Sequence, residues 1–149
     1  MQQSGGTLPV ILTPQHFMKI GGLLVQKTKR KSIALTPGQI VICEFREDKL
    51  SKEDNKRRFS VIVEESSLFA NGYPNVILVP ITDDENISIP DLSVIINPTP
   101  ENGFQKRNII VSHLVSTTSK FCIEPTSYRV TPEELSEVRD QISLLLGIS

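Results

Sequence analysis

Two short apolar runs stand out in the pattern of hydrophobic and polar positions along the chain. Residues 58–63 form the first run and follow a densely charged stretch, whereas residues 76–82 form the second and lead directly into three acidic residues. Both runs are rich in β-branched side chains, and both are shorter than a typical helix. The pattern therefore predicts two buried strands of a small sheet.

Each of these runs carries a polar residue at one end. Arg58 opens the first run, and Thr82 closes the second. Residues at the ends of neighbouring strands can face each other across the rim of a β-barrel. A guanidinium fork matches the geometry of a phosphate, and a hydroxyl adds a further hydrogen-bond donor. Arg58 and Thr82 are therefore candidates for binding a phosphodiester.

Further strands and one terminal helix are predicted around the two runs. A turn at residues 36–38 leads into a strand at residues 39–46, and later apolar stretches predict strands at residues 91–97, 108–115 and 127–130. Thr131, Pro132 and Glu134 suit the cap, the first position and the capping box of a helix. Apolar residues then recur on one face at positions 135, 138, 142 and 145, and Gly147 is placed to end the helix.

The N-terminal part of the chain differs from the rest. Thr13 and Pro14 resemble the start of a helix, and Phe17, Ile20 and Leu24 recur at helical spacing. We expect a short helix here that ends in the basic run at residues 27–31. Residues 1–36 would then form an N-terminal extension, made of a tail, this helix and the basic run, ahead of one domain spanning residues 37–149. Short strands followed by one amphipathic helix predict a mostly β (α+β) fold, a small curved sheet or barrel with a helix on it.

Charge is distributed unevenly along the chain. The 149 residues carry a net charge of −1, yet residues 1–40 have five basic and no acidic residues, and residues 67–149 have five basic and ten acidic ones. A nucleic-acid footprint would therefore be local, and Lys56, Arg57 and Arg58 form one such basic cluster. No apolar run approaches the roughly 20 residues that span a bilayer. A secretory signal pattern and a disulfide framework are not evident, so a cytoplasmic protein with no membrane association is expected.

Several segments together resemble the MazF/PemK-type toxins of bacterial toxin–antitoxin pairs. The similar segments are residues 37–41, the charged loop after them, and residues 57–63, 78–82, 108–119 and 144–148. The resemblance covers residues 37–149. It implies an SH3-like barrel, a homodimer, and cleavage of single-stranded RNA without a metal or another cofactor. It also implies a cognate antitoxin, a small acidic protein whose tail occupies the RNA groove.

The resemblance also assigns roles to residues of this chain. Arg58 and Thr82 would serve the scissile phosphate, and the loop before Arg58 would close over the RNA. Lys56, Arg57, Phe59 and Ser112 are expected to contact the substrate. Family members usually have proline where this chain has Phe59. Because RNA carries its own nucleophile, the 2′-hydroxyl, the protein has only to move protons and stabilise the charged phosphorane.

The proton acceptor for this reaction is not evident from Arg58 and Thr82, because arginine remains protonated. His113 lies in the predicted strand at residues 108–115, where simple alternation places it on the same face as Val111 and Val115. It is therefore either a core residue or, if this strand lines the RNA groove, the proton acceptor.

The three acidic residues at positions 83–85 stand next to the proposed phosphate site, where they would repel RNA. We expect them to point away or to pair with Lys56 and Arg57. Two other functions stay open. One is a non-hydrolytic toxin similar to CcdB, which shares the fold and binds DNA gyrase. The other is a catalytically silent module that binds a protein tail.

Overall fold

The computed structural model describes residues 17–20, 23–26, 35–44 and 57–148 of the chain. The chain divides into two compact units, Met1–Ile33 and Ala34–Ser149. In the first unit, β1 (Phe17–Ile20) and β2 (Leu23–Gln26) form an antiparallel pair in which Ile20 lies opposite Leu23. The helix predicted here is therefore wrong. The two strands are separated by Gly21-Gly22, a dipeptide that favours a tight hairpin over a helix.

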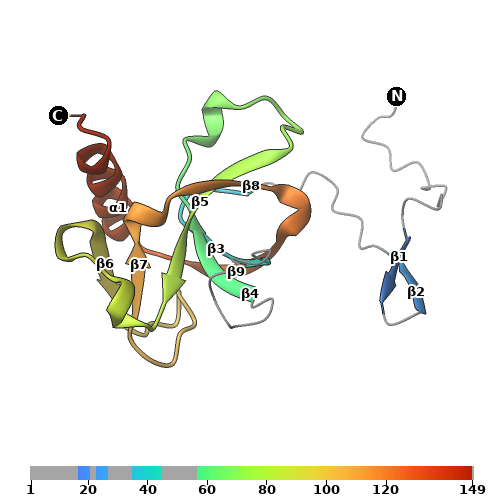
Figure 1. Ribbon diagram of the computed structural model, residues 1–149, viewed down its shortest axis with the longest axis horizontal. Helices are drawn as coiled ribbons and strands as arrows, with labels where there is room; N and C mark the ends of the chain where they lie inside the picture. The colour runs from blue at the N-terminus through green and yellow to red at the C-terminus, as the bar shows by residue number, and fades with distance from the viewer. Residues whose placement is uncertain (1–16, 21–22, 27–34, 45–56, 149) are drawn as a thin grey trace. The chain divides into compact units, whose positions relative to one another are not determined.

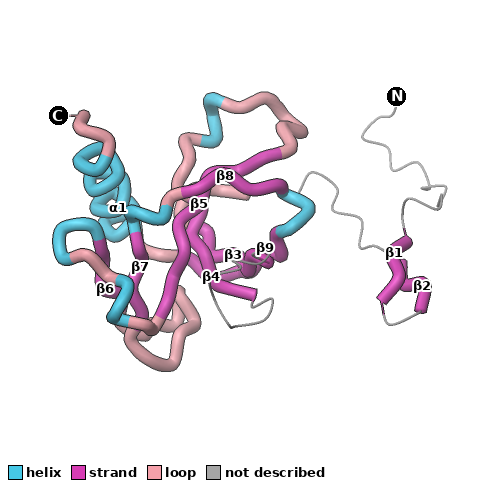
Figure 2. The backbone as a smooth tube through the Cα atoms, viewed as in Figure 1, coloured by secondary structure: helices cyan, strands magenta, loops and turns pink. Residues whose placement is uncertain are grey.

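The second unit is an antiparallel sheet with one helix after it (Figures 1 and 2). Its elements are β3 (Gln39–Glu44), β4 (Arg57–Ile62), β5 (Asn75–Thr82), β6 (Ser93–Ile96), β7 (Asn108–Val111), β8 (Ser116–Ser119), β9 (Ile123–Arg129) and α1 (Pro132–Leu145). The strand order is β6-β7-β5-β4-β3-β9, and β8 also pairs with β5. The predicted fold class, mostly β with a C-terminal helix, is confirmed. Among the described residues, however, the sheet is curved and open rather than closed into a barrel.

Strand β5 is shared among three neighbours. It pairs with β8 from Asn75 to Leu78, with β4 from Leu78 to Pro80, and with β7 through its last two residues. The ladder between β4 and β5 therefore ends at the pair formed by Ser60 and Pro80. Proline has no N–H to donate to a ladder. Beyond Pro80, β5 continues beside β7, while the start of β4 is left free of β5.

Two hydrophobic clusters lie on opposite faces of this sheet. The larger consists of Ile40, Val61, Val63, Val79, Ile81, Val94, Ile96, Ile110, Val130 and Val138. The smaller consists of Val41, Cys43, Ile62, Val76, Leu78 and Ile123. Consecutive residues of β4 and β5 alternate between the two clusters, as the two-residue period of a strand requires. Cys43 is buried as a free thiol, and its burial raises the pKa of that thiol.

Helix α1 covers the larger cluster and has the predicted start. The hydroxyl of Thr131 accepts the backbone N–H of Glu134 at 3.0 Å, and the Glu134 carboxylate accepts the backbone N–H of Thr131 at 2.8 Å. Val138 is fully buried. Arg139 ties the helix to the end of β4, because its guanidinium donates to the carbonyls of Val63 and Glu64, both at 3.0 Å.

The strand predicted at residues 108–115 is shorter than expected. Strand β7 ends at Val111, and residues 112–114 form a 3-10 turn before β8 begins. No strand was predicted at β8, because its four residues are all serine or threonine and show no apolar alternation.

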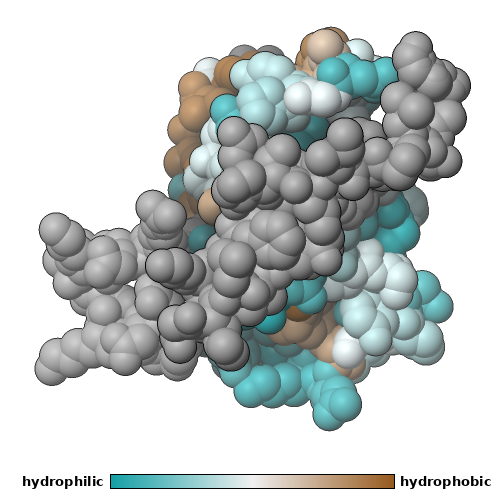
Figure 3. All heavy atoms as spheres, turned by 90° about the vertical axis from the view of Figure 1, so that its right-hand side faces the viewer, coloured by the Kyte–Doolittle hydropathy of each residue, from teal (hydrophilic) through white to brown (hydrophobic). Residues whose placement is uncertain are grey.

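The face of the molecule in Figure 3 carries both hydrophilic and hydrophobic residues. No helix in the described ranges is long and apolar enough to cross a membrane.

Candidate nucleic-acid site

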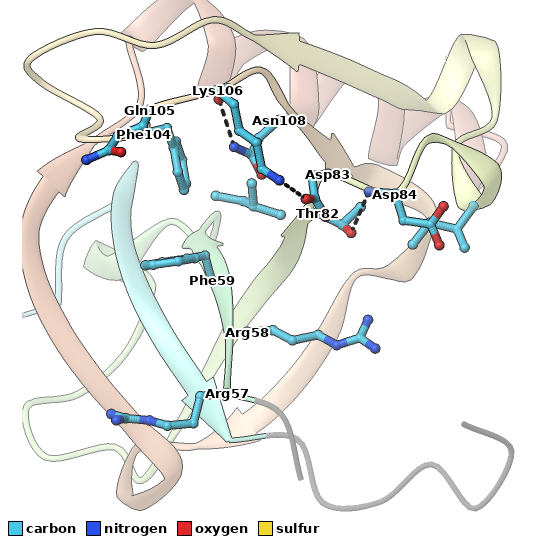
Figure 4. A pocket seen from close by; sticks show the side chains of 12 residues that line it. Arg57, Arg58, Phe59, Thr82, Asp83, Asp84, Phe104, Gln105, Lys106 and Asn108 are labelled. Carbon is cyan, nitrogen blue, oxygen red and sulfur yellow. Dashed lines mark hydrogen bonds and ion pairs between the residues drawn. The ribbon is translucent and has the colours of Figure 1, made fainter. Parts of the chain in front are cut away.

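A pocket of about 970 Å³ opens where β4 separates from β5 (Figure 4). It lies between the first residues of β4, the last residues of β5 and the segment that leads into β7. The lining residues are Arg57, Arg58, Phe59, Ile81, Thr82, Asp83, Asp84, Ile87, Phe104, Gln105, Lys106 and Asn108. The ladder between β4 and β5 therefore ends at a cavity, and the last residues of β5 and the first residues of β4 line it.

Arg58 and Thr82 both line this pocket. Each lies two residues beyond the Ser60–Pro80 pair at which the ladder ends, and strand alternation places both on the face of the smaller hydrophobic cluster. Both residues are half-buried. The two polar strand ends that stood out in the sequence therefore belong to one site, because the pocket opens just beyond the last pair of the β4–β5 ladder.

The Thr82 hydroxyl has a defined orientation. Its oxygen accepts the backbone N–H of Asp84 at 3.1 Å. A hydroxyl that accepts in one direction still has its own O–H to donate in another. The chain turn after β5 therefore presents Thr82 as a positioned donor at the pocket.

Arg57 extends in the opposite direction from Arg58 (Figure 4). Its guanidinium forms an ion pair with the carboxylate of Glu124 on β9, and both side chains are about half exposed. Arg57 thus lines the pocket while its charge is directed toward β9. Lys56, the third member of the predicted basic cluster, lies outside the described residues.

The acidic residues after β5 do not pair as the sequence led us to expect. Asp83 forms an ion pair with Lys106, and Glu85 pairs with Arg107 at 3.0 Å. The Asp84 carboxylate accepts the backbone N–H of Asn86 at 3.0 Å. Neither expected arrangement is seen for Asp83 and Asp84: both line the pocket, and Arg57 pairs with Glu124. Antiparallel β5 and β7 instead bring residues 106–107 alongside residues 83–85. The hydrogen bond from Lys106, followed by its positive charge, lowers the pKa of Asp83.

An aromatic pair forms another wall of the pocket. Phe59 and Phe104 lie edge to face, with ring centroids 5.3 Å apart and planes at 87°. Phe59 is 41% exposed, whereas Phe104 is half-buried against the larger cluster. Phe59 follows Arg58 directly on β4, so the two side chains leave opposite faces of the strand.

Ser112 and His113 do not line this pocket. Ser112 is fully buried and donates to the side-chain oxygen of Gln141 on α1 at 2.7 Å. His113 lies in the 3-10 turn, where the alternation used to place it does not apply. Its Nδ1 is buried without a hydrogen-bond partner among the described residues.

The sequence did not single out Phe104, Lys106 or Asn108. All three lie in or just before β7, the strand that pairs with the end of β5. The Lys106-Arg107 dipeptide immediately before an apolar strand was the available signal. Using it would have required knowing that this strand pairs with β5, which is a long-range property.

The arrangement combines groups that suit a nucleotide. Arg58 supplies a cation, Thr82 supplies a hydroxyl donor, and the aromatic pair supplies an apolar surface. The nearby carboxylates are partly neutralised by Lys106 and Arg107. No group of three or more metal-ligating side chains occurs within the described ranges.

Comparison with known proteins identifies similar chains. The family model for the PemK-like, MazF-like toxin of type II toxin–antitoxin systems matches residues 36–146. A MazE–MazF structure from Deinococcus radiodurans has a TM-score of 0.55 and 18% identity, and the match covers 76% of this chain and 96% of that chain. A mycobacterial endoribonuclease in complex with its cognate antitoxin has a TM-score of 0.56 and 16% identity over 76% of this chain and 95% of that chain.

The toxin MazF-mt6 of Mycobacterium tuberculosis is also similar. Its TM-score is 0.54 at 15% identity, and the match covers 74% of this chain and 98% of that chain. At such low identity the three structures show a shared fold. No curated protein sequence matches this chain significantly.

Proposed function

Because the chain belongs to the PemK-like, MazF-like toxin family of type II toxin–antitoxin systems, we propose that it is an endoribonuclease that cleaves single-stranded RNA. The observation that carries the proposal is the pocket where β4 leaves β5. There Arg58 and Thr82 line one cavity, and Asp83 and Glu85 beside it have cationic partners.

The chemistry assigned to the pocket needs no metal. The 2′-hydroxyl of RNA attacks the neighbouring phosphorus, the bond from phosphorus to the 5′-oxygen breaks, and a 2′,3′-cyclic phosphate forms while the departing 5′-oxygen takes a proton from water. Arg58 stabilises the negative charge that develops on the phosphate, and the Thr82 hydroxyl donates to one of its oxygens. A further group accepts the proton of the 2′-hydroxyl. His113 keeps this role as a sequence-based prediction only, since the pocket does not include it.

We also propose two partners. One is a cognate antitoxin, and two of the structures with this fold, including the mycobacterial complex, contain one. The other is a second copy of the chain, since the family resemblance implies a homodimer. Light scattering at micromolar concentration tests the dimer, and a monomer would contradict it.

The decisive experiment is cleavage of a long, unstructured RNA by the purified chain in the presence of EDTA. Arg58→Ala should lower the rate about 10²–10³-fold, which is typical for loss of one preorganised charge-stabilising group. Arg58→Lys should recover part of it, because the charge remains and the fork is lost. Arg129→Ala removes an arginine outside the pocket and serves as the control.

The same experiment separates the alternative functions. A wild-type chain that cleaves no RNA but inhibits DNA gyrase would support the hypothesis of a non-hydrolytic toxin similar to CcdB. A chain that does neither and binds only an antitoxin tail would be a silent interaction module. Cleavage that is equal in the wild type and in Arg58→Ala would remove Arg58 from the site.

A further inference from the structure

We propose that the Phe59–Phe104 wall is a stacking platform for the nucleobase next to the scissile phosphate. The proposal rests on the proposed function, because it assumes that Arg58 and Thr82 hold the phosphate. It adds a base-recognition role on the opposite face of β4.

The geometry of β4 supports this division. Arg58 and Phe59 are consecutive, and the pocket reaches both because β5 no longer covers this part of β4. Figure 4 shows Phe59 directed toward Phe104, while Arg58 extends to the other side. A nucleotide whose phosphate lies at Arg58 and Thr82 would therefore have its base within reach of the aromatic wall.

The platform is held in place before any ligand arrives. Asn102 is 3% exposed, and its side-chain oxygen accepts the backbone N–H groups of Thr99 and Phe104 at 3.1 and 3.0 Å. Its amide also donates to the carbonyl of Asn97 at 2.8 Å. Gly103, at φ +71°, lies under the ring of Tyr128, with which a Cβ would collide. These contacts fix the backbone at Phe104, so little conformational entropy remains to be lost on binding.

The exposure of the wall fits a ligand surface better than a core. Phe104 packs against the larger hydrophobic cluster, but Phe59 is 41% exposed beside charged groups. Bases stack on aromatic side chains regardless of sequence, because every base has a π-face. Preference among bases would come from stacking strength and from polar residues that line the pocket, such as Gln105 and Asn108.

The test uses an RNA oligonucleotide that carries the mapped cleavage site, and a second one with abasic riboses on both sides of the scissile phosphate. Phe59→Leu keeps the apolar volume but removes the ring, and it should slow cleavage of the intact RNA about tenfold or more. The wild type should cleave the abasic RNA about tenfold more slowly than the intact RNA. On the abasic RNA, Phe59→Leu should cleave at nearly the same rate as the wild type. Phe59→Trp should restore the rate on intact RNA.

Phe69→Leu is the matched control, because Phe69 pairs with Tyr73 outside the pocket. Binding of DNA of the same sequence, which lacks the 2′-hydroxyl, should weaken by a similar factor in Phe59→Leu and not in Phe69→Leu. Equal slowing of intact and abasic RNA by Phe59→Leu, or no slowing at all, would overturn the stacking role while leaving the proposed nuclease intact. A wild-type chain that cleaves no RNA would overturn both.

Discussion

Asp83 and Lys106 form an ion pair that joins the segment after β5 to the segment before β7 at the rim of the pocket. The pair matters for binding because it compensates a carboxylate one residue away from Thr82. Lys106→Met should leave Asp83 uncompensated and weaken RNA binding. Adding Asp83→Asn to the Lys106→Met variant should restore RNA binding, because both charges of the pair are then absent. Affinity measured at low and high salt checks this, since added salt should reduce the difference between the variants.

The same pair predicts how Asp83 titrates. Its pKa is lowered in the folded protein, first by the hydrogen bond from Lys106 and then by the lysine charge. The pair therefore contributes to stability above the ordinary aspartate pKa, and the contribution is lost as pH falls through the lower folded-state value. Carboxyl NMR should show Asp83 titrating at higher pH in Lys106→Met than in the wild type. An identical titration would mean that the pair does not form in solution.

The Thr82 hydroxyl is predicted to act as a donor to phosphate. Thr82→Val, which keeps the shape of the side chain, should lower the cleavage rate about 10²–10³-fold, whereas Thr82→Ser should retain most of it. Thr117→Val makes the same change at an exposed position on β8 and should have no effect. A Thr82→Val variant as active as the wild type would show that the hydroxyl is dispensable.

Ser60 offers a test of stability at the end of the ladder between β4 and β5. Its side chain is fully buried, and its hydroxyl has no hydrogen-bond partner among the described residues. Ser60→Ala should therefore leave the free energy of unfolding unchanged or raise it by about 1 kcal/mol. Ser93→Ala is the contrasting variant, because the Ser93 hydroxyl bonds the backbone of Ile89. Urea unfolding should show a loss for Ser93→Ala only.

The start of α1 can be tested in the same way. Thr131→Ala removes the side-chain half of the capping box and should cost about 1 kcal/mol of unfolding free energy. Thr131→Ser should retain most of that stability, because serine also caps well. Equal stability of Thr131→Ala and the wild type in urea would show that the cap contributes nothing to the folded state.

The parts of the fold that local signals specify could be predicted from the sequence. The cap at Thr131, the glycine that ends α1 and the apolar runs of β4 and β5 each depend on neighbouring residues, and all were placed correctly. The hairpin at β1 and β2 was mistaken for a helix, because Phe17, Ile20 and Leu24 fit a helical spacing as well as two short strands. Gly21-Gly22 was the signal that should have decided between them.

The site was predictable only where a residue marks the end of its own strand. Arg58 and Thr82 could be singled out for this reason, and strand pairing then brought them together. The partners of residues 83–85 and the aromatic partner of Phe59 depend on the pairing of β5 with β7, which sequence patterns do not reveal. His113 was misplaced because nothing in the pattern marks the end of β7 at Val111.

The division of β5 among three neighbours also determines which changes in chain length the protein can accept. Residues 67–73, between β4 and β5, take no part in the ladders, so insertions and deletions there should be tolerated. Deleting one residue within β5 would shift the rest of the strand by one position and exchange its two faces. Asp83 would then occupy the position of Thr82 at the pocket, and Thr82 would take the position of Ile81 on the face of the larger hydrophobic cluster. Natural relatives should therefore vary in length before Asn75 but keep the spacing from Asn75 to Thr82.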